Sequence, residues 1–93
     1  MREKARQISR IMKILASEYR LLILCELMNG PQTVNGILDR IEGISQSALS
    51  QHLAVMKANN VVDYDKKGQN VIYTICDSRV ADIIRTLKKY YCS

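Results

Sequence analysis

The sequence predicts a mainly α-helical domain with one β-hairpin, which comes just before the last helix. Apolar residues recur at helical spacing along most of the chain. Residues 61–76 alternate instead with a period of two on either side of a glycine. The 93 residues suffice for a single domain, residues 1–93. Because a chain of this length buries only about 60–65% of its unfolded surface, we expect it to form a homodimer.

Two amphipathic helices are expected before residue 30. The first, residues 3–16, has an apolar stripe formed by Ile8, Ile11, Met12 and Leu15. Ser17 can cap the second helix, which Asn29-Gly30-Pro31 ends. The inward face of this second helix repeats the same i, i+3, i+4, i+7 spacing and is expected to consist of Leu21, Leu24, Cys25 and Met28.

A short helix and a longer one follow. Thr33 can cap the short helix, and Gly43 ends it; its inward residues are expected to be Val34, Ile37, Leu38 and Ile41. Ser45 can cap the longer helix, where Ile44 and Leu49 stand at the positions of a hydrophobic staple. The longer helix should face the core with Leu49, Leu53 and Met56, which leaves polar, uncharged side chains exposed at its start.

The rest of the chain predicts a hairpin and a fifth helix. Residues 61–66 and 70–76 are the expected strands, joined by Lys67-Gly68-Gln69. Asp77 or Ser78 can cap the last helix, whose apolar face is Val80, Ile83, Ile84, Leu87 and Tyr91. The first and last helices each carry an apolar stripe that needs a partner, so we expect them to form the dimer interface.

Two helices followed by a hairpin match a winged helix-turn-helix, in which the second helix enters the major groove of DNA. Ser and Gln exchange hydrogen bonds with base edges, and Lys side chains reach phosphates. The expected DNA contacts are Thr33, Ser45, Gln46, Ser47, Ser50, Gln51 and Lys57, together with Lys66, Lys67 and Gln69 of the hairpin. Ser and Gln also solvate helices that bind nothing; the hairpin that follows favours DNA reading, and the net charge of +5 agrees with it.

Other classes of protein are disfavoured. No apolar run approaches the roughly 18 residues of a membrane span, and Met1 to Lys4 precede no signal-peptide core, so we expect a cytoplasmic protein. No nucleophile, base and orienting group occur together, so neither an enzyme nor a cofactor is expected. His52 lies between the inward positions of its helix, which favours a packing or backbone contact over metal binding.

Three segments are the most distinctive: residues 21–25 (LLILC), 45–53 (SQSALSQHL) and 68–75 (GQNVIYTI). Together they resemble the ArsR/SmtB family of winged-helix bacterial repressors, over essentially the whole chain. The resemblance implies a homodimer that occupies a palindromic operator in double-stranded DNA. It also implies that the dimer leaves the operator when an inducer binds or reacts.

The cysteines decide which branch of the family the chain resembles. Metal-sensing members place Cys in the third helix, or Asp and His in the last; here the third helix has neither Cys nor His, and the last has Asp77 and Asp82 but no His. Metal sensing is therefore not expected. The chain is instead similar to the BigR/SqrR/HlyU branch, whose two cysteines are matched by Cys25 and Cys92.

That similarity implies redox sensing, in which the two thiols react with a persulfide, a polysulfide or another oxidant and DNA affinity falls. We expect Cys92 to attack first and Cys25 to act as the resolving partner. Cys76 matches no family cysteine. Three alternatives stay open: a constitutive DNA-binding repressor whose thiols are inert, a metal-responsive repressor, and a protein-binding module on the same fold.

Overall fold

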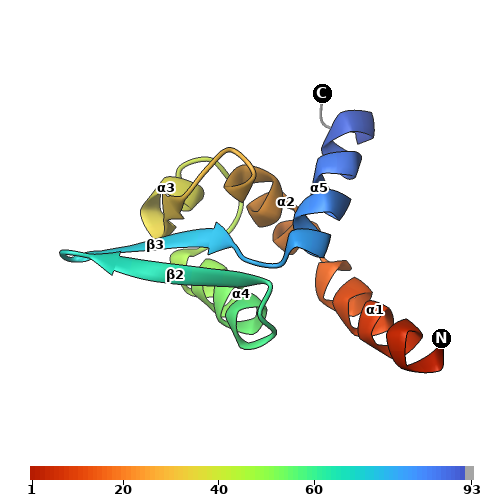
Figure 1. The fold of residues 1–93 in the computed structure, drawn as a ribbon. Coiled ribbons are helices and arrows are strands. Elements are labelled where there is room, and N and C mark those ends of the chain that lie inside the picture. The colour runs from red at the N-terminus through yellow and green to blue at the C-terminus, as the bar shows by residue number, and fades with distance from the viewer. Residues whose placement is uncertain (92–93) are drawn as a thin grey trace.

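The computed structural model describes residues 1–91, and in that range it contains five helices and three strands. In chain order these are α1 (Arg2–Leu15), α2 (Glu18–Leu27), β1 (Gln32–Thr33), α3 (Val34–Leu38), α4 (Gln46–Ala58), β2 (Val62–Lys67), β3 (Asn70–Ile75) and α5 (Ser78–Tyr91). Figure 1 shows the β2–β3 hairpin, the wing, reaching out at one end of the molecule. Helices α1 and α5 lie at the other end, away from the tip of the wing.

The three predicted hydroxyl caps are confirmed. The side chain of Ser17 accepts a hydrogen bond from the backbone N of Arg20, and that of Ser45 from the N of Ala48. Thr33 caps α3 through the backbone N of Gly36, at 3.0 Å. Each of these bonds satisfies a backbone donor that the first turn of a helix leaves unpaired. Three of the helices therefore begin where a single hydroxyl residue predicts it.

The predicted inward face of α2 is only partly right. Ile23, Leu24 and Leu27 are buried, whereas Leu21, Cys25 and Met28 are half-buried. Helix α2 contacts α1, α3, α5 and β3, so it is covered from several sides rather than along one stripe. A periodicity argument assumes one buried face and so misplaces the face of a central helix.

Helix α3 is shorter than its apolar pattern predicts. It ends at Leu38, and a turn carries the chain through Ile41, which is still buried, to Gly43. Gly43 has a φ of +81°, and a Cβ there would lie 3.0 Å from the hydroxyl oxygen of Tyr19. That hydroxyl donates a hydrogen bond of 2.8 Å to the Gly43 carbonyl. Gly43 therefore lets the turn before α4 press against α2.

Strand β1 was not predicted. It has two residues and pairs antiparallel with β3, Gln32 opposite Tyr73 and Thr33 opposite Ile72, so the sheet order is β1-β3-β2. Two residues are too few to show a period-two alternation. The pairing ties the middle of β3 to the start of α3.

The wing has a tighter tip than expected. Strand pairing continues to Lys67 opposite Asn70, which leaves a two-residue loop, Gly68 and Gln69. Gly68 has a φ of +63°, as the first loop residue of such a turn requires. Lys67 is thus the last residue of β2 rather than part of the loop. At the other end β3 stops at Ile75, so Cys76 lies just beyond the strand.

Helix α4 ends in a Schellman motif that leads straight into β2. The backbone N of Val61 donates to the Met56 carbonyl at 2.9 Å, and that of Asn60 to the Lys57 carbonyl at 3.1 Å. Asn60 supplies the left-handed residue, with a φ of 59°. Val61 and Met56 are both fully buried, which provides the hydrophobic contact that accompanies this motif.

The cap of α5 carries a charge that folding stabilises. The Oδ1 of Asp77 accepts hydrogen bonds from the backbone N of Arg79 and of Val80, at 2.8 and 3.3 Å. The hydrogen bond from the Arg79 side chain is the main reason why the pKa of Asp77 lies below its ordinary value of 3.8. Asp77→Ala should therefore lower the free energy of unfolding at pH 7 by about 1 kcal/mol.

The effect of Asp77→Ala should depend on pH. A carboxylate whose pKa is lowered in the folded state stabilises the fold above its unfolded pKa, and this stabilisation is lost as the pH falls through the folded pKa. The stability difference should be full above about pH 5 and should shrink as the pH falls below about 4, the ordinary pKa of the carboxyl group. Urea unfolding at a series of pH values measures it. Asp77→Asn is the control, since it keeps an acceptor oxygen without the charge; a pH-independent difference for Asp77→Ala would contradict this account.

Candidate nucleic-acid interface

The leading edge of α4 is exposed and carries no charge. Ser45, Gln46, Ser47, Ser50 and Gln51 are all exposed, whereas Leu49 and Leu53 on the inward face of the helix are fully buried. The hydroxyl of Ser45 accepts the capping bond and still has its proton to donate. This surface offers hydroxyl and amide groups to a partner, and no acid lies in the first turn of the helix.

A groove of about 210 Å³ joins this edge to the wing. It is lined by Thr33 and Asn35 at the start of α3, by Gln46 of α4 and by Gln69 and Asn70 at the tip of the wing. Three of the predicted DNA contacts, from three separate elements, thus lie together. Asn35 and Asn70 were missed in the sequence, because nothing in a linear pattern brings the start of α3 near the hairpin tip.

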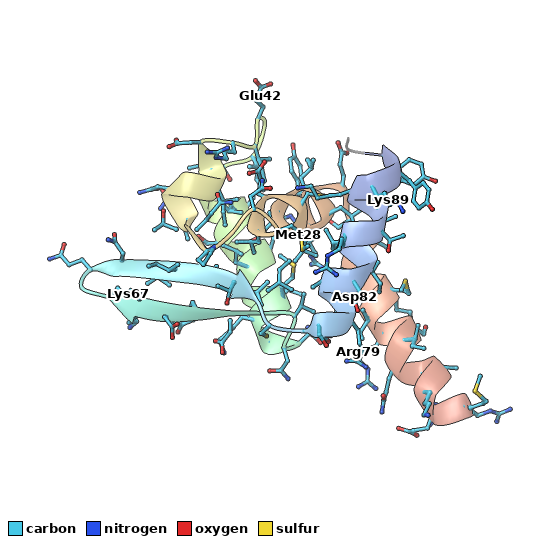
Figure 2. The ribbon with its side chains drawn as sticks, turned by 45° about the horizontal axis from the view of Figure 1, so that its top comes forward. Met28, Glu42, Lys67, Arg79, Asp82 and Lys89 are labelled. Atoms are coloured by element: carbon cyan, nitrogen blue, oxygen red, sulfur yellow. The ribbon has the colours of Figure 1, made fainter. Side chains whose placement is uncertain are left out.

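The basic side chains divide into two kinds. Lys66 and Lys67 are exposed on the wing, and Figure 2 shows Lys67 at the end of the molecule opposite Lys89 of α5. Lys57 is instead engaged within the fold. Its Nζ lies 3.2 Å from Oδ1 of Asp63 and 5.7 Å from the centre of the Tyr64 ring. A phosphate would have to compete with these partners for Lys57.

His52 faces α2 rather than the exposed edge of α4. Its Nδ1 accepts a hydrogen bond of 3.1 Å from Nε of Arg20, and its ring lies 6.3 Å from that of Tyr19. The side chain is half-buried. These contacts agree with the packing role expected from its position between inward residues.

Cys25 borders a cavity of about 460 Å³ between α2, the turn after α3 and α5. From α5, Lys88 extends its Nζ to within 3.5 Å of the Cys25 carbonyl oxygen and 3.1 Å of Oδ1 of Asn29. Glu26 lines the same cavity, and its Oε2 is buried. Cys92, the second predicted redox residue, lies outside the described residues.

Cys76 has a different environment. It is exposed, and its Sγ lies 3.2 Å from the carbonyl oxygen of Asn60, to which the thiol can donate. Partial burial raises the pKa of the Cys76 thiol, and the carboxylates of Asp63 and Asp77 raise it further. A higher pKa leaves less of the reactive thiolate at neutral pH.

Helix α1 presents an apolar stripe that the rest of the described chain leaves partly uncovered. Ile8 is 52% and Met12 is 43% exposed, while Ile14 and Leu15 at the end of the helix are buried. On α5, the predicted apolar face is buried at Val80 and Ile84, but Tyr91 is 81% exposed. The first stripe is thus free to meet another surface.

Residues 1–91 contain neither a candidate membrane-spanning helix nor a candidate metal site. None of their helices is long and apolar enough to cross a membrane. Within the same range, no three His, Cys, Asp or Glu side chains are grouped so that they could hold a metal ion.

Comparison with known proteins identifies the family. The model of the bacterial regulatory protein arsR family matches residues 17–64, more than half of the chain. The chain belongs to the ArsR family. The matched ArsR segment runs from the cap of α2 into β2 and so contains α3, α4 and the turn that joins them.

Individual ArsR-family relatives agree over nearly the whole length. The transcriptional regulator YgaV of Escherichia coli is 41% identical over 92 residues, which cover 99% of this chain and 93% of YgaV. The structure of reduced HlyU from Vibrio cholerae gives a TM-score of 0.94 at 36% identity, covering 100% of this chain and 97% of HlyU. The transcriptional repressor BigR from Xylella fastidiosa gives a TM-score of 0.88 at 26% identity, covering 99% and 90%.

These ArsR-family matches confirm the predicted fold class, a winged helix with five helices and a hairpin wing. The protein is a DNA-binding regulator of transcription, in a family that includes repressors and the branch of HlyU and BigR. The relatives compared above are named as regulators, not as enzymes.

Proposed function

We propose that this ArsR-family protein is a repressor that binds operator DNA as a homodimer through α4 and the wing. We propose further that it releases the operator when Cys25 and Cys92 react with a persulfide, a polysulfide or another oxidant. The observation that carries the first part is the exposed, uncharged edge of α4, which meets the wing tip in one groove. The second part rests on the position of Cys25 at the cavity beneath α5.

The DNA contacts follow from the exposed groups. Gln46, Ser47, Ser50 and Gln51 offer donors and acceptors of the kind that read base edges in the major groove. Lys66, Lys67 and Gln69 are exposed toward the tip of the wing, where they can contact phosphate. Thr33 and Ser45 lie at helix starts, where backbone donors and hydroxyls commonly bind phosphates. Lys57 can contact a DNA phosphate if that phosphate replaces Asp63 as the partner of its ammonium group.

The dimer would form through α1 and α5. Regulators of this family bind operator DNA and are generally dimeric. Ile8 and Met12 lie one turn apart on α1 and leave apolar surface in water, which association with a second copy would bury. Two reading helices must stand roughly 34 to 36 Å apart to enter successive major grooves on one side of the DNA.

The redox proposal rests on contacts between α2 and α5. Lys88 binds the Cys25 carbonyl, so the face of α5 that contains Lys88 lies against the end of α2. Cys92 comes four residues after Lys88 in the sequence, directly after the last residue of α5. A bond between the two cysteines would tie the last helix to α2 and would change the angle at which α5 meets the partner.

The persulfide itself is the oxidant in the proposed reaction of the two cysteines, so no other oxidant is needed. The Cys92 thiolate attacks the outer sulfur of a persulfide RS–SH, forms Cys92–S–SH and releases RS⁻. The Cys25 thiolate then attacks the sulfur of Cys92 that is bonded to carbon, which forms a Cys25–Cys92 disulfide and releases HS⁻. A polysulfide that delivers two sulfur atoms leaves one of them between the cysteines, which extends the reach of the bridge beyond that of a disulfide.

Operator titrations test the proposal. Polysulfide treatment should weaken binding of the wild-type protein about tenfold, the usual scale of coupling between two sites. Cys25→Ser and Cys92→Ser should bind DNA normally and should not respond. Cys76→Ser is the matched control and should respond like the wild type, because Cys76 lies apart from the cavity beside α5.

Two outcomes would contradict parts of the proposal. Equal operator affinity before and after treatment would make the protein a constitutive repressor with inert thiols. DNA binding that does not weaken with rising salt would contradict phosphate contacts and would favour a protein-binding module. The mass of the treated protein distinguishes a disulfide, which loses two hydrogens, from a bridge that retains added sulfur.

A further inference from the structure

Two neighbouring residues at the start of α2 connect the end of α1 to the reading helix α4. Arg20 donates from Nη1 to the carbonyl oxygen of Ile14 at 3.3 Å, and from Nε to Nδ1 of His52 at 3.1 Å. Tyr19 donates its hydroxyl to the Gly43 carbonyl at 2.8 Å, in the turn that leads into α4. The first turn of α2 therefore holds α4 at two places, and through Arg20 it also holds the last turn of α1.

The hydrogen bond between Arg20 and His52 specifies one form of the imidazole. A guanidinium group only donates hydrogen bonds and keeps its charge at every pH that a protein tolerates. The Nδ1 of His52 must therefore accept, so the ring is neutral and its proton is on Nε2. A protonated ring would lose this bond and would place a second positive charge 3.1 Å from Nε of Arg20.

Nothing on α4 itself would offset that second charge. The helix contains no Asp or Glu, and the residues one turn away from His52 are Ala48, Leu49, Val55 and Met56, none of which titrates. From α2, the groups against His52 are the Arg20 guanidinium and the Tyr19 ring. From α1, the pair meets the neutral carbonyl of Ile14.

We propose that Arg20 and His52 are a pair of positioning residues that fix the reading helix relative to the end of α1, and that operator binding requires the neutral, accepting form of His52. The inference rests on the proposed reading of DNA by α4. The two reading helices of a dimer can bind one operator together only when both have the correct orientation relative to α1. Loss of the pair leaves a smaller fraction of the protein in that arrangement, and the apparent affinity falls by the same factor.

The composition of the chain makes this inference easy to test. His52 is the only histidine among the 93 residues, so an imidazole signal or a histidine-dependent pH effect belongs to it. Histidine is also the side chain that ordinarily changes charge between pH 5 and 8. His52→Gln is the matched variant, since an amide oxygen can accept the Arg20 bond and does not titrate. Arg20→Met removes both hydrogen bonds and keeps an apolar stem.

The probe is a 30-base-pair duplex that the wild-type dimer selects from a random pool at pH 7.5. Its affinity is measured by fluorescence anisotropy at pH 7.5 and 5.5, at constant ionic strength. The wild type should bind more weakly at pH 5.5, by up to about tenfold where the bond to Arg20 is lost completely, which is the scale of a hydrogen bond to a charged group. His52→Gln should change less than about threefold over the same range, and Arg20→Met should be weak at both pH values.

A measurement without DNA separates this inference from the proposed function. The ¹⁵N spectrum of the single imidazole at pH 7.5 should show an unprotonated Nδ1, and a protonated Nδ1 would overturn the pair. If the wild type binds the duplex but His52→Gln keeps the same pH dependence, the inference fails while DNA reading stands. If the wild type selects no duplex at all, both fail. If Arg20→Met does not fold, the pH dependence of His52→Gln and the ¹⁵N spectrum still test whether Arg20 and His52 act as a pair.

Discussion

Ser47→Asp should abolish most operator binding while leaving the protein as stable as the wild type. Ser47 is exposed in the first turn of α4, on the edge that we assign to base reading. A carboxylate there would face the acidic DNA, at a cost of about 1 to 3 kcal/mol for each reading helix. Since a homodimer carries the change twice, we expect the affinity to fall about hundredfold or more.

The stability of this variant provides an internal control. A negative charge in the first turn of a helix is favoured by the helix dipole, typically by about 0.3 to 1 kcal/mol. The melting temperature of Ser47→Asp should therefore be equal to or higher than that of the wild type, so a loss of binding cannot come from unfolding. Ser47→Ala separates charge from hydrogen bonding and should weaken binding by about tenfold at most. An operator affinity that is unchanged in Ser47→Asp would show that α4 is not the reading helix.

Ile8→Glu combined with Met12→Glu should convert the dimer into a folded monomer. Both side chains are substantially exposed in the protomer, so their replacement removes little from its own core. In a dimer built on α1, four carboxylates would instead be buried near one another. The free energy needed to remove them from water would exceed the free energy gained by association. A monomer can occupy only one half-site, and the loss of the linked second contact should weaken operator binding by about a thousandfold.

Sedimentation reports this change directly. The double variant should sediment as a particle of 10.6 kDa, and the wild type as twice that mass. Arg10→Glu puts a carboxylate on the opposite side of α1 and should stay dimeric. A double variant that remained dimeric would show that the interface lies elsewhere, and a monomeric variant with full operator affinity would show that pairing is not needed for binding.

The sequence predicted well those features that depend on a few neighbouring residues. The caps Ser17, Thr33 and Ser45 are local, because each hydroxyl bonds a backbone N three residues later. The two strands of the wing were recognisable from alternation around Gly68. The polar edge of α4 followed from the buried spacing of Leu49, Leu53 and Met56.

Features that depend on distant parts of the chain could not be predicted. Strand β1 exists only because β3 lies beside it, and the burial of α2 is set by four elements that pack around it. The bond between Arg20 and His52 joins residues 32 positions apart, so no spacing rule suggests it. The groove that collects Thr33, Gln46 and Gln69 likewise depends on the assembled fold.

The left-handed residue Asn60 has a consequence for how such a regulator can change. The turn at Asn60 joins α4 to β2 through buried Met56 and Val61. The helix and the wing therefore form one unit that contacts a set length of DNA. In the proposed dimer, the distance between two such units is set elsewhere, where the two protomers meet. A signal that acts at the meeting surface thus alters the length of operator that the pair can span, and the preference for particular bases within each half stays the same.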